Sequence, residues 1–179
     1  MIEVEIKCPI SDPEGVAEQL VKKVNAKFIK TVFQKDIYLQ HPSKNFAETD
    51  EALRIRDSEE GIQLTYKGPK IDTLSKTREE LCVYVDNFDT ILKIFERVGF
   101  FPVAKVNKSR RIFHIEGNIS AVIDQVQDLG NYIELESETK DYSQVEVKRE
   151  ELLSLLDKLG YPRENTERRS YLELIMAKF

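Results

Sequence analysis

The chain has 179 residues, of which 41% are hydrophobic and 33% are charged, so it is long enough to form one domain with a substantial core. Its net charge of −5 at pH 7 disfavours general attraction to nucleic acid or to an anionic membrane. Cys8 and Cys82 form neither a disulfide framework nor a zinc-ligand spacing, and no apolar run approaches the ~20 residues of a membrane helix. We therefore expect a cytoplasmic protein with reduced thiols.

The first segment, residues 1–7, alternates between apolar and charged positions. Apolar side chains stand at positions 2, 4 and 6, and Glu3, Glu5 and Lys7 stand between them. A strand sends successive side chains to opposite faces, so this pattern predicts a strand with one apolar and one charged face. A half-buried strand of an ordinary antiparallel sheet has the same pattern. The alternative is that Glu3 and Glu5 face an enclosed space and bind a divalent cation, which prefers oxygen ligands.

The rest of the chain predicts helices separated by groups of strands. Asp12 and Pro13 indicate a helix start, Asp86-Asn87 indicates a second, and Ser143-x-x-Glu146 resembles a capping box that opens a third. We expect these helices to end near Asn25, Gly99 and Gly160, with a short helix in the tail. Further strands are expected over residues 27–40, 52–56, 62–67, 77–85, 100–114, 119–126 and 132–138. Residues 41–50 and 70–75 are expected to be loops.

About eight of the predicted strands have one charged face and one apolar face. Their charged positions are Glu3, Glu5, Lys7, Arg54, Arg56, Lys67, Arg78, Glu80, Lys108, Arg110, Asp124, Glu134 and Glu136. Eight strands are enough for a closed barrel whose interior holds side chains or one small ligand. The charged faces could look outward or inward. The amphipathic helices need an apolar surface to pack on, which favours a charged interior with the helices outside.

A charged interior is costly unless its charges are paired, hydrated or bound to a ligand. Acidic and basic residues are mixed along the charged faces, and such a mixture suits a complex of metal ions with a polyphosphate. Carboxylates would hold the cations, while Lys and Arg would bind phosphate oxygens.

Six motifs in order resemble the CYTH superfamily, the triphosphate tunnel metalloenzymes. The first is Glu3-x-Glu5-x-Lys7, and the others are Leu53-Arg54-Ile55-Arg56, Lys67-Gly68-Pro69, Arg78-x-Glu80, Lys108-x-Arg110, and Asp124 followed by Gly130-x-Tyr132-x-Glu134-x-Glu136. Within the superfamily, Asp36-Ile37-Tyr38-Leu39 and Arg169-Ser170-Tyr171 are most similar to class IV adenylyl cyclases. The chain departs from the pattern at Cys82, where many members carry another acid.

The resemblance implies an α+β fold, a closed eight-stranded antiparallel barrel or tunnel, formed by a single domain over residues 1–179. It also implies a homodimer that requires Mg²⁺ or Mn²⁺. The implied metal ligands are Glu3, Glu5, Glu134, Glu136, Asp124 and Glu80. The implied triphosphate-binding residues are Lys7, Arg54, Arg56, Lys67, Arg78, Lys108 and Arg110. Glu3, Glu5, Glu134 and Lys108 are the implied catalytic residues.

Three functions are compatible with these residues. The first is a lyase of the class IV adenylyl cyclase type, which binds ATP and converts it to cyclic AMP and pyrophosphate. The second is a triphosphatase that acts on inorganic triphosphate or on an organic triphosphate such as thiamine triphosphate. The third is a non-catalytic module that binds polyphosphate or nucleotide, but an anion binder has no use for the acidic pairs. The sequence does not show a base pocket that would separate the first two.

Overall fold

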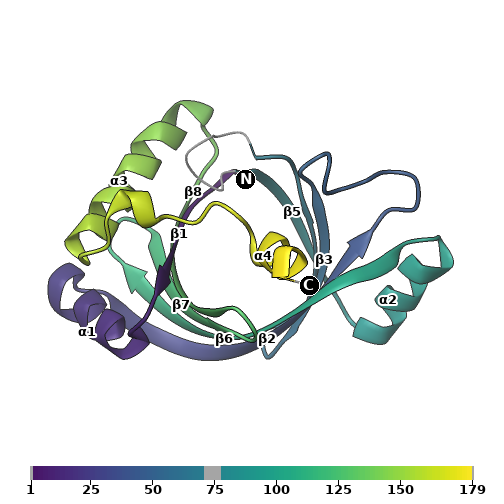
Figure 1. Cartoon of the computed structure of the whole chain (residues 1–179), viewed down its shortest axis with the longest axis horizontal. Helices are drawn as coiled ribbons and strands as arrows, with labels where there is room; N and C mark the ends of the chain where they lie inside the picture. Colours follow the sequence, from purple (N-terminus) through teal and green to yellow (C-terminus); the bar gives the residue numbers. More distant parts are fainter. Residues whose placement is uncertain (1, 71–77, 179) are drawn as a thin grey trace.

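Eight antiparallel strands form a closed barrel in the computed structural model, which describes residues 2–70 and 78–178 (Figure 1). The strands are β1 (Ile2–Ile10), β2 (Lys27–Gln40), β3 (Ala52–Ser58), β4 (Gly61–Lys67), β5 (Arg78–Val85), β6 (Phe101–Ile115), β7 (Ile119–Val126) and β8 (Gly130–Thr139). Their order around the barrel is β1-β5-β4-β3-β2-β6-β7-β8. The predicted closed eight-stranded barrel is confirmed. The loop predicted over residues 70–75 lies, apart from Lys70, outside the described residues, and so does Thr77.

The helices begin close to the residues that the sequence indicates. In α1 (Pro13–Val24), Asp12 Oδ1 accepts a hydrogen bond from the Gly15 N–H at 2.9 Å, and in α2 (Phe88–Arg97) Asn87 Oδ1 accepts one from the Thr90 N–H at 2.8 Å. These bonds satisfy N–H groups that have no partner within a first helical turn. Both predicted starts are confirmed.

The capping box predicted at Ser143 is wrong. Residues 142–144 form a short 3-10 turn, and α3 (Val145–Lys158) begins only after it. Asp141 caps the turn by accepting hydrogen bonds from the N–H and the hydroxyl of Ser143 at 2.9 and 2.7 Å. Asp141 therefore takes the capping role, because its carboxylate reaches the backbone two residues further on.

Three of the helices pack against apolar side chains on the outer surface of the barrel. The faces of β1, β6, β7 and β8 that point away from the interior pack against α1 and α3, with Val4, Ile6, Ile133 and Leu152 at most 2% exposed. On the other side, α2 covers an apolar patch that includes Ile55. Burial of these apolar faces is the main driving force for folding. It also sends the opposite faces of the same strands to the interior, because side chains alternate along a strand.

The terminal helix α4 (Tyr171–Lys178) takes a different place. It lies within the outline of the barrel in Figure 1, and Tyr171 and Leu174 pack against interior-facing side chains of the strands, among them Tyr38, Val106 and Tyr132. The helix thus covers one end of the barrel. No helix in the described ranges is both long enough and apolar enough to cross a membrane.

Candidate active site

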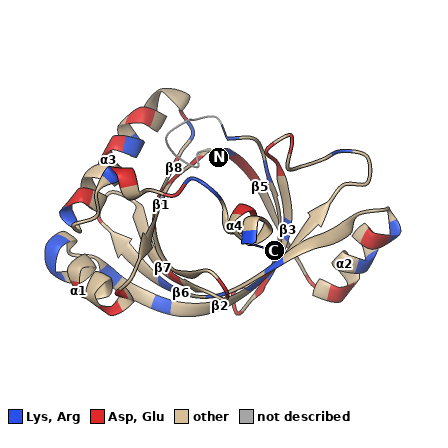
Figure 2. Ribbon diagram, in the orientation of Figure 1, with Lys and Arg blue, Asp and Glu red and all other residues tan. Residues whose placement is uncertain are grey.

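The charged face of the barrel strands surrounds a cavity of about 370 Å³, here called the tunnel cavity. Figure 2 shows acidic and basic residues distributed over the strands that enclose it. The predicted site residues that line it are Glu3, Glu5, Arg54, Arg56, Lys67, Arg78, Glu80, Lys108, Arg110, Glu134 and Glu136. Lys7 and Asp124 share the parity of the interior residues and are 1% and 0% exposed, but they are not among the residues that line the cavity. The inward orientation of the charges is therefore the one that the structure adopts.

Three carboxylates of β1 and β8 form one group, here called the acid cluster. Glu5 and Glu136 are opposite each other in the strand register, and Glu134 is the next interior residue along β8. One oxygen from each of Glu5, Glu134 and Glu136 lies within 4.8 Å of the others. Burial raises the pKa of Glu136 to about 7, with Glu134 and Glu5 adding to the shift and Arg110 opposing it. Mutual repulsion of this kind is relieved when a cation binds.

Glu3 and Glu80 form a second acidic pair on the neighbouring strands β1 and β5. Lys67 pairs with Glu80. Burial raises the pKa of Glu3 well above its usual range, and the nearby carboxylates add to the shift against the opposing effect of Lys67. The pair lies next to the acid cluster, since Glu5 and Glu136 contribute to the shift at Glu3.

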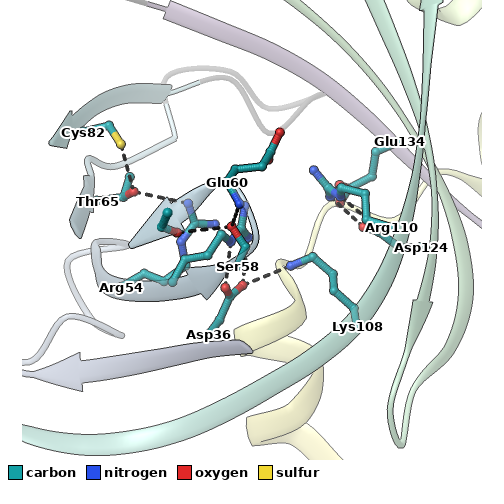
Figure 3. Close-up of polar contacts among 12 residues, drawn as sticks. Asp36, Arg54, Ser58, Glu60, Thr65, Cys82, Lys108, Arg110, Asp124 and Glu134 are labelled. Carbon is teal, nitrogen blue, oxygen red and sulfur yellow. Dashed lines mark hydrogen bonds and ion pairs between the residues drawn. The ribbon is translucent and has the colours of Figure 1, made fainter. Parts of the chain in front are cut away.

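Asp124 is held by two donors on other elements. Arg110 Nε and Nη2 donate to its two oxygens at 2.8 and 2.6 Å, and the Tyr171 hydroxyl of α4 donates to Oδ2 at 2.9 Å. Arg110 also pairs with Glu134 and Glu136. In this arrangement Asp124 holds Arg110 against the acid cluster, and Figure 3 shows Arg110 beside Asp124 and Glu134.

Asp36 is the residue that the sequence analysis did not place in the site. Its carboxylate accepts from Arg56 Nε and Nη2 at 2.7 and 2.8 Å and from Lys108 Nζ at 3.0 Å (Figure 3). Burial by itself would raise the pKa of Asp36, but the two cations hold it well below its usual range. The signal was present in the sequence, because Asp36 and Gln34 share the parity of Tyr38 on one strand. Thr65 and Tyr171 are further lining residues that were not predicted to be in the site.

Arg54 differs from the other buried guanidinium groups. It is 8% exposed and makes no ion pair within 4.0 Å in the described part of the chain. Burial alone would lower the pKa of its guanidinium, but the more distant carboxylates of Asp36, Glu80 and Glu3 raise it. Its Nη2 donates to the Thr65 hydroxyl at 3.2 Å, and its buried Nε has no hydrogen-bond partner among residues 2–70 and 78–178. The Thr65 hydroxyl in turn donates to Cys82 Sγ at 3.6 Å. A buried, positively charged hydrogen-bond donor in the wall of a cavity is suited to an anionic ligand.

Two predicted phosphate-binding residues lie at the margins of the tunnel cavity. Lys7 is 1% exposed, and its Nζ donates to the carbonyl of Arg169 and stands 4.3 Å from the ring centre of Tyr171. It therefore lies at the end covered by α4. Arg78 lines the cavity, with Nη2 3.6 Å from Asp50 Oδ1.

The oxygen-rich acid cluster fits a hard divalent cation such as Mg²⁺ or Mn²⁺, because such ions bind carboxylates and keep further positions for phosphate oxygens and water. Glu5, Glu134 and Glu136 would hold the ion. The described residues offer no comparable cluster of histidine or cysteine.

Lys108 predicts a pH dependence of anion binding. Burial lowers the pKa of its ammonium group to about 8, against the opposing effect of Asp36. The charged form is lost as the pH rises through that value. We expect affinity for inorganic triphosphate to fall by about tenfold as the pH rises through the pKa of Lys108. A tenfold change corresponds to the loss of about one hydrogen bond from a charged group. Calorimetric titration at several pH values measures it.

The Lys108→Arg variant is the control for this prediction, because a guanidinium stays charged throughout. Ionisation of the triphosphate itself affects both proteins equally, so only the difference between the two curves counts. Parallel curves for the wild type and the variant would contradict a role for Lys108 in the pH dependence.

The fold and the site together define a class of protein: a barrel with a charged interior that suits a polyanion and a cation. The CYTH domain model matches residues 1–171, and the chain belongs to the CYTH family of triphosphate tunnel proteins. It is 47% identical to "Putative adenylate cyclase" of Methanocaldococcus jannaschii, covering 97% of this chain and 98% of the relative. A solved structure from Pyrococcus horikoshii is 38% identical with a TM-score of 0.90, covering 99% of both chains. A Hippeastrum protein with a dominant triphosphatase activity shares the fold at 17% identity and a TM-score of 0.66, covering 99% of this chain and 95% of that one.

Proposed function

We propose that the protein is a divalent-metal-dependent enzyme of the class IV adenylyl cyclase type, which converts ATP to cyclic AMP and pyrophosphate. The observation that carries this proposal is the placement of Arg54, a buried guanidinium that makes no ion pair within 4.0 Å among the described residues, in the same cavity as the acid cluster. The pair of features supports binding of a polyphosphate together with a cation. The M. jannaschii relative supports the choice of a cyclase.

The residues of this chain would bind and orient the substrate. Arg54 and Lys108, which both line the tunnel cavity, would hold the β- and γ-phosphates, and Arg56 would support Lys108 through their shared partner Asp36. Arg110 is held against the acid cluster by Asp124 and would face the α-phosphate on that side. Phosphoryl chemistry needs this positioning and charge stabilisation more than covalent work by the protein.

In the cyclase reaction, the 3′-hydroxyl oxygen of ATP forms a bond to the α-phosphorus. The bond between the α-phosphorus and the oxygen that bridges the α- and β-phosphates breaks. Pyrophosphate leaves, and the basic side chains stabilise its charge. The hydroxyl proton passes to solvent water, because Glu5, Glu134 and Glu136 would be engaged as ligands of the cation. A bound Mg²⁺ or Mn²⁺ would neutralise phosphate charge and make the hydroxyl more acidic.

A triphosphatase is the second candidate. Water would then attack the terminal phosphorus, and orthophosphate would leave. The observation in favour is that the side chains around the tunnel cavity are mainly charged, so they suit the triphosphate and not the nucleoside. The Hippeastrum protein demonstrates that this barrel architecture supports such an activity.

One assay separates the candidates. The protein is incubated with ATP, inorganic triphosphate or thiamine triphosphate, each with Mg²⁺ or Mn²⁺, and the products are resolved by chromatography. We expect cyclic AMP and pyrophosphate from ATP, and no turnover in EDTA. Orthophosphate as the only product would replace the cyclase with the hydrolase. Binding of the ligands without any product would leave only a binding module.

A further inference from the structure

A second cavity of about 310 Å³ lies between α4 and the segment that joins β2 to β3. Apolar side chains from several elements form much of its wall: Leu39, Phe46, Ala47, Ala52, Val103, Leu172 and Met176. Small-molecule sites occupy roughly 300–1,000 Å³ and are mostly apolar with a few polar groups. This second cavity, here called the apolar pocket, has the size and lining of such a site.

The apolar pocket adjoins the tunnel cavity. Ala52, Arg78 and Ser170 line both of them. A ligand whose charged part occupies the tunnel cavity can therefore place an attached apolar part in the pocket. Arg78, which is 6% exposed, lies at the junction and carries the positive charge there.

Ion pairs connect the two walls of the apolar pocket. Lys70 Nζ contacts Asp50 Oδ1 at 2.7 Å, in the segment before β3, and Glu173 Oε1 at 3.1 Å, on α4. Glu173 also accepts from the Ser170 N–H at 2.6 Å. These contacts hold α4 against the segment before β3, so the pocket is formed without a ligand and costs little to order on binding.

We propose that the apolar pocket binds the nucleobase of a nucleoside triphosphate whose phosphates occupy the tunnel cavity. This inference rests on the proposed function, and it specifies the substrate class as an organic triphosphate rather than inorganic triphosphate. A flat, weakly polar base gains from contact with Phe46, Leu172 and Met176, while inorganic triphosphate has no part that would enter the pocket.

Substitutions on the two walls of the pocket test this assignment. Met176 is 55% exposed on α4, and Ala47 is exposed in the segment before β3, so both sites tolerate a change without loss of the fold. Met176→Ser removes apolar contact with a base, and Ala47→Trp fills the space. Val147→Ser is the matched control, because Val147 is 59% exposed on α3, away from both cavities.

Affinity is measured by calorimetry for ATP and for inorganic triphosphate, with Ca²⁺ in place of Mg²⁺ and with recovery of intact ligand verified by chromatography. We expect Met176→Ser and Ala47→Trp to weaken ATP binding by about tenfold, as removal of an apolar group from a binding pocket does. Affinity for inorganic triphosphate should stay within twofold, and Val147→Ser should behave as the wild type for both ligands.

The other outcomes have distinct meanings. Unchanged ATP affinity in both pocket variants would overturn the assignment and leave the triphosphate site intact. Equal losses of affinity for both ligands would also overturn the assignment, because loss of a base site should weaken the binding of ATP alone. A change in oligomeric state without a change in ATP affinity would instead indicate that a second copy of the chain covers the pocket. If the wild type binds neither ligand, the proposed function fails and this inference fails with it.

Discussion

The Glu5→Gln variant should lose at least about 100-fold in turnover of whichever triphosphate the protein uses. Glu5 is 6% exposed on β1 and belongs to the acid cluster with Glu134 and Glu136. The amide keeps the size of the side chain but removes one negative charge from the group that would hold the cation. Changes that act on a metal only through its ligands already cost ~10–100-fold, so loss of a ligand charge should cost at least the upper value.

The fold should survive this substitution, because removal of one of three clustered negative charges relieves repulsion. Circular dichroism and thermal unfolding test that expectation, and Mn²⁺ affinity measured by electron paramagnetic resonance should fall together with turnover. Glu79→Gln is the matched control, since Glu79 is exposed on the outer face of β5. Turnover equal to that of the wild type in Glu5→Gln would refute the metal-ligand role.

The largest effect on stability is expected from Asp36→Asn. Asp36 is fully buried between Arg56 and Lys108, whose side chains are 11% and 2% exposed. An amide leaves both cations buried without a negative partner, and breaking a buried ion pair in this way costs about 3–5 kcal/mol. Urea unfolding monitored by circular dichroism measures the loss. Asp57→Asn is the control. Asp57 follows Arg56 directly on β3, so its side chain faces away from the cavity.

The same residue predicts how stability depends on acid. The folded-state pKa of Asp36 lies below its unfolded value of about 3.9, so its contribution is fully present above that pH. The contribution is lost as the pH falls through the folded-state pKa. The wild type should therefore lose stability more steeply than Asp36→Asn below about pH 4. If Asp36→Asn lowers the free energy of unfolding by less than about 1 kcal/mol at neutral pH, the role given to this network is contradicted. The same holds if the stability of the wild type and the variant falls equally with decreasing pH.

The alternation of charged and apolar residues determined the barrel and the inward direction of its charges. In β1, β3, β6 and β8, the apolar positions pack under helices, and the opposite positions reach the tunnel cavity. Periodicity is a local property of the sequence, and it specifies which side chains share a face. The helix starts at Asp12 and Asn87 are also local features, because capping depends on residues only three positions apart.

Three features depended on contacts between residues far apart in the sequence. Asp36 joins Arg56 and Lys108 across three strands, and Tyr171 of α4 reaches Asp124, 47 residues away. Neither pairing follows from the pattern of one segment, because side-chain partners are set by how the strands close and how the tail returns to the barrel. The apolar pocket arises in the same way, from the docking of α4 against the segment before β3.

The sequence by itself therefore determined the barrel, its charged interior and most of the residues that face it. Only the tertiary structure decided which acids cluster, which bases form ion pairs, and that Arg54 forms none within 4.0 Å among the described residues. The physical reason is that alternation selects a face of the sheet, whereas ion pairs form between neighbours in space. Closure of the barrel and docking of its terminal helix select those neighbours.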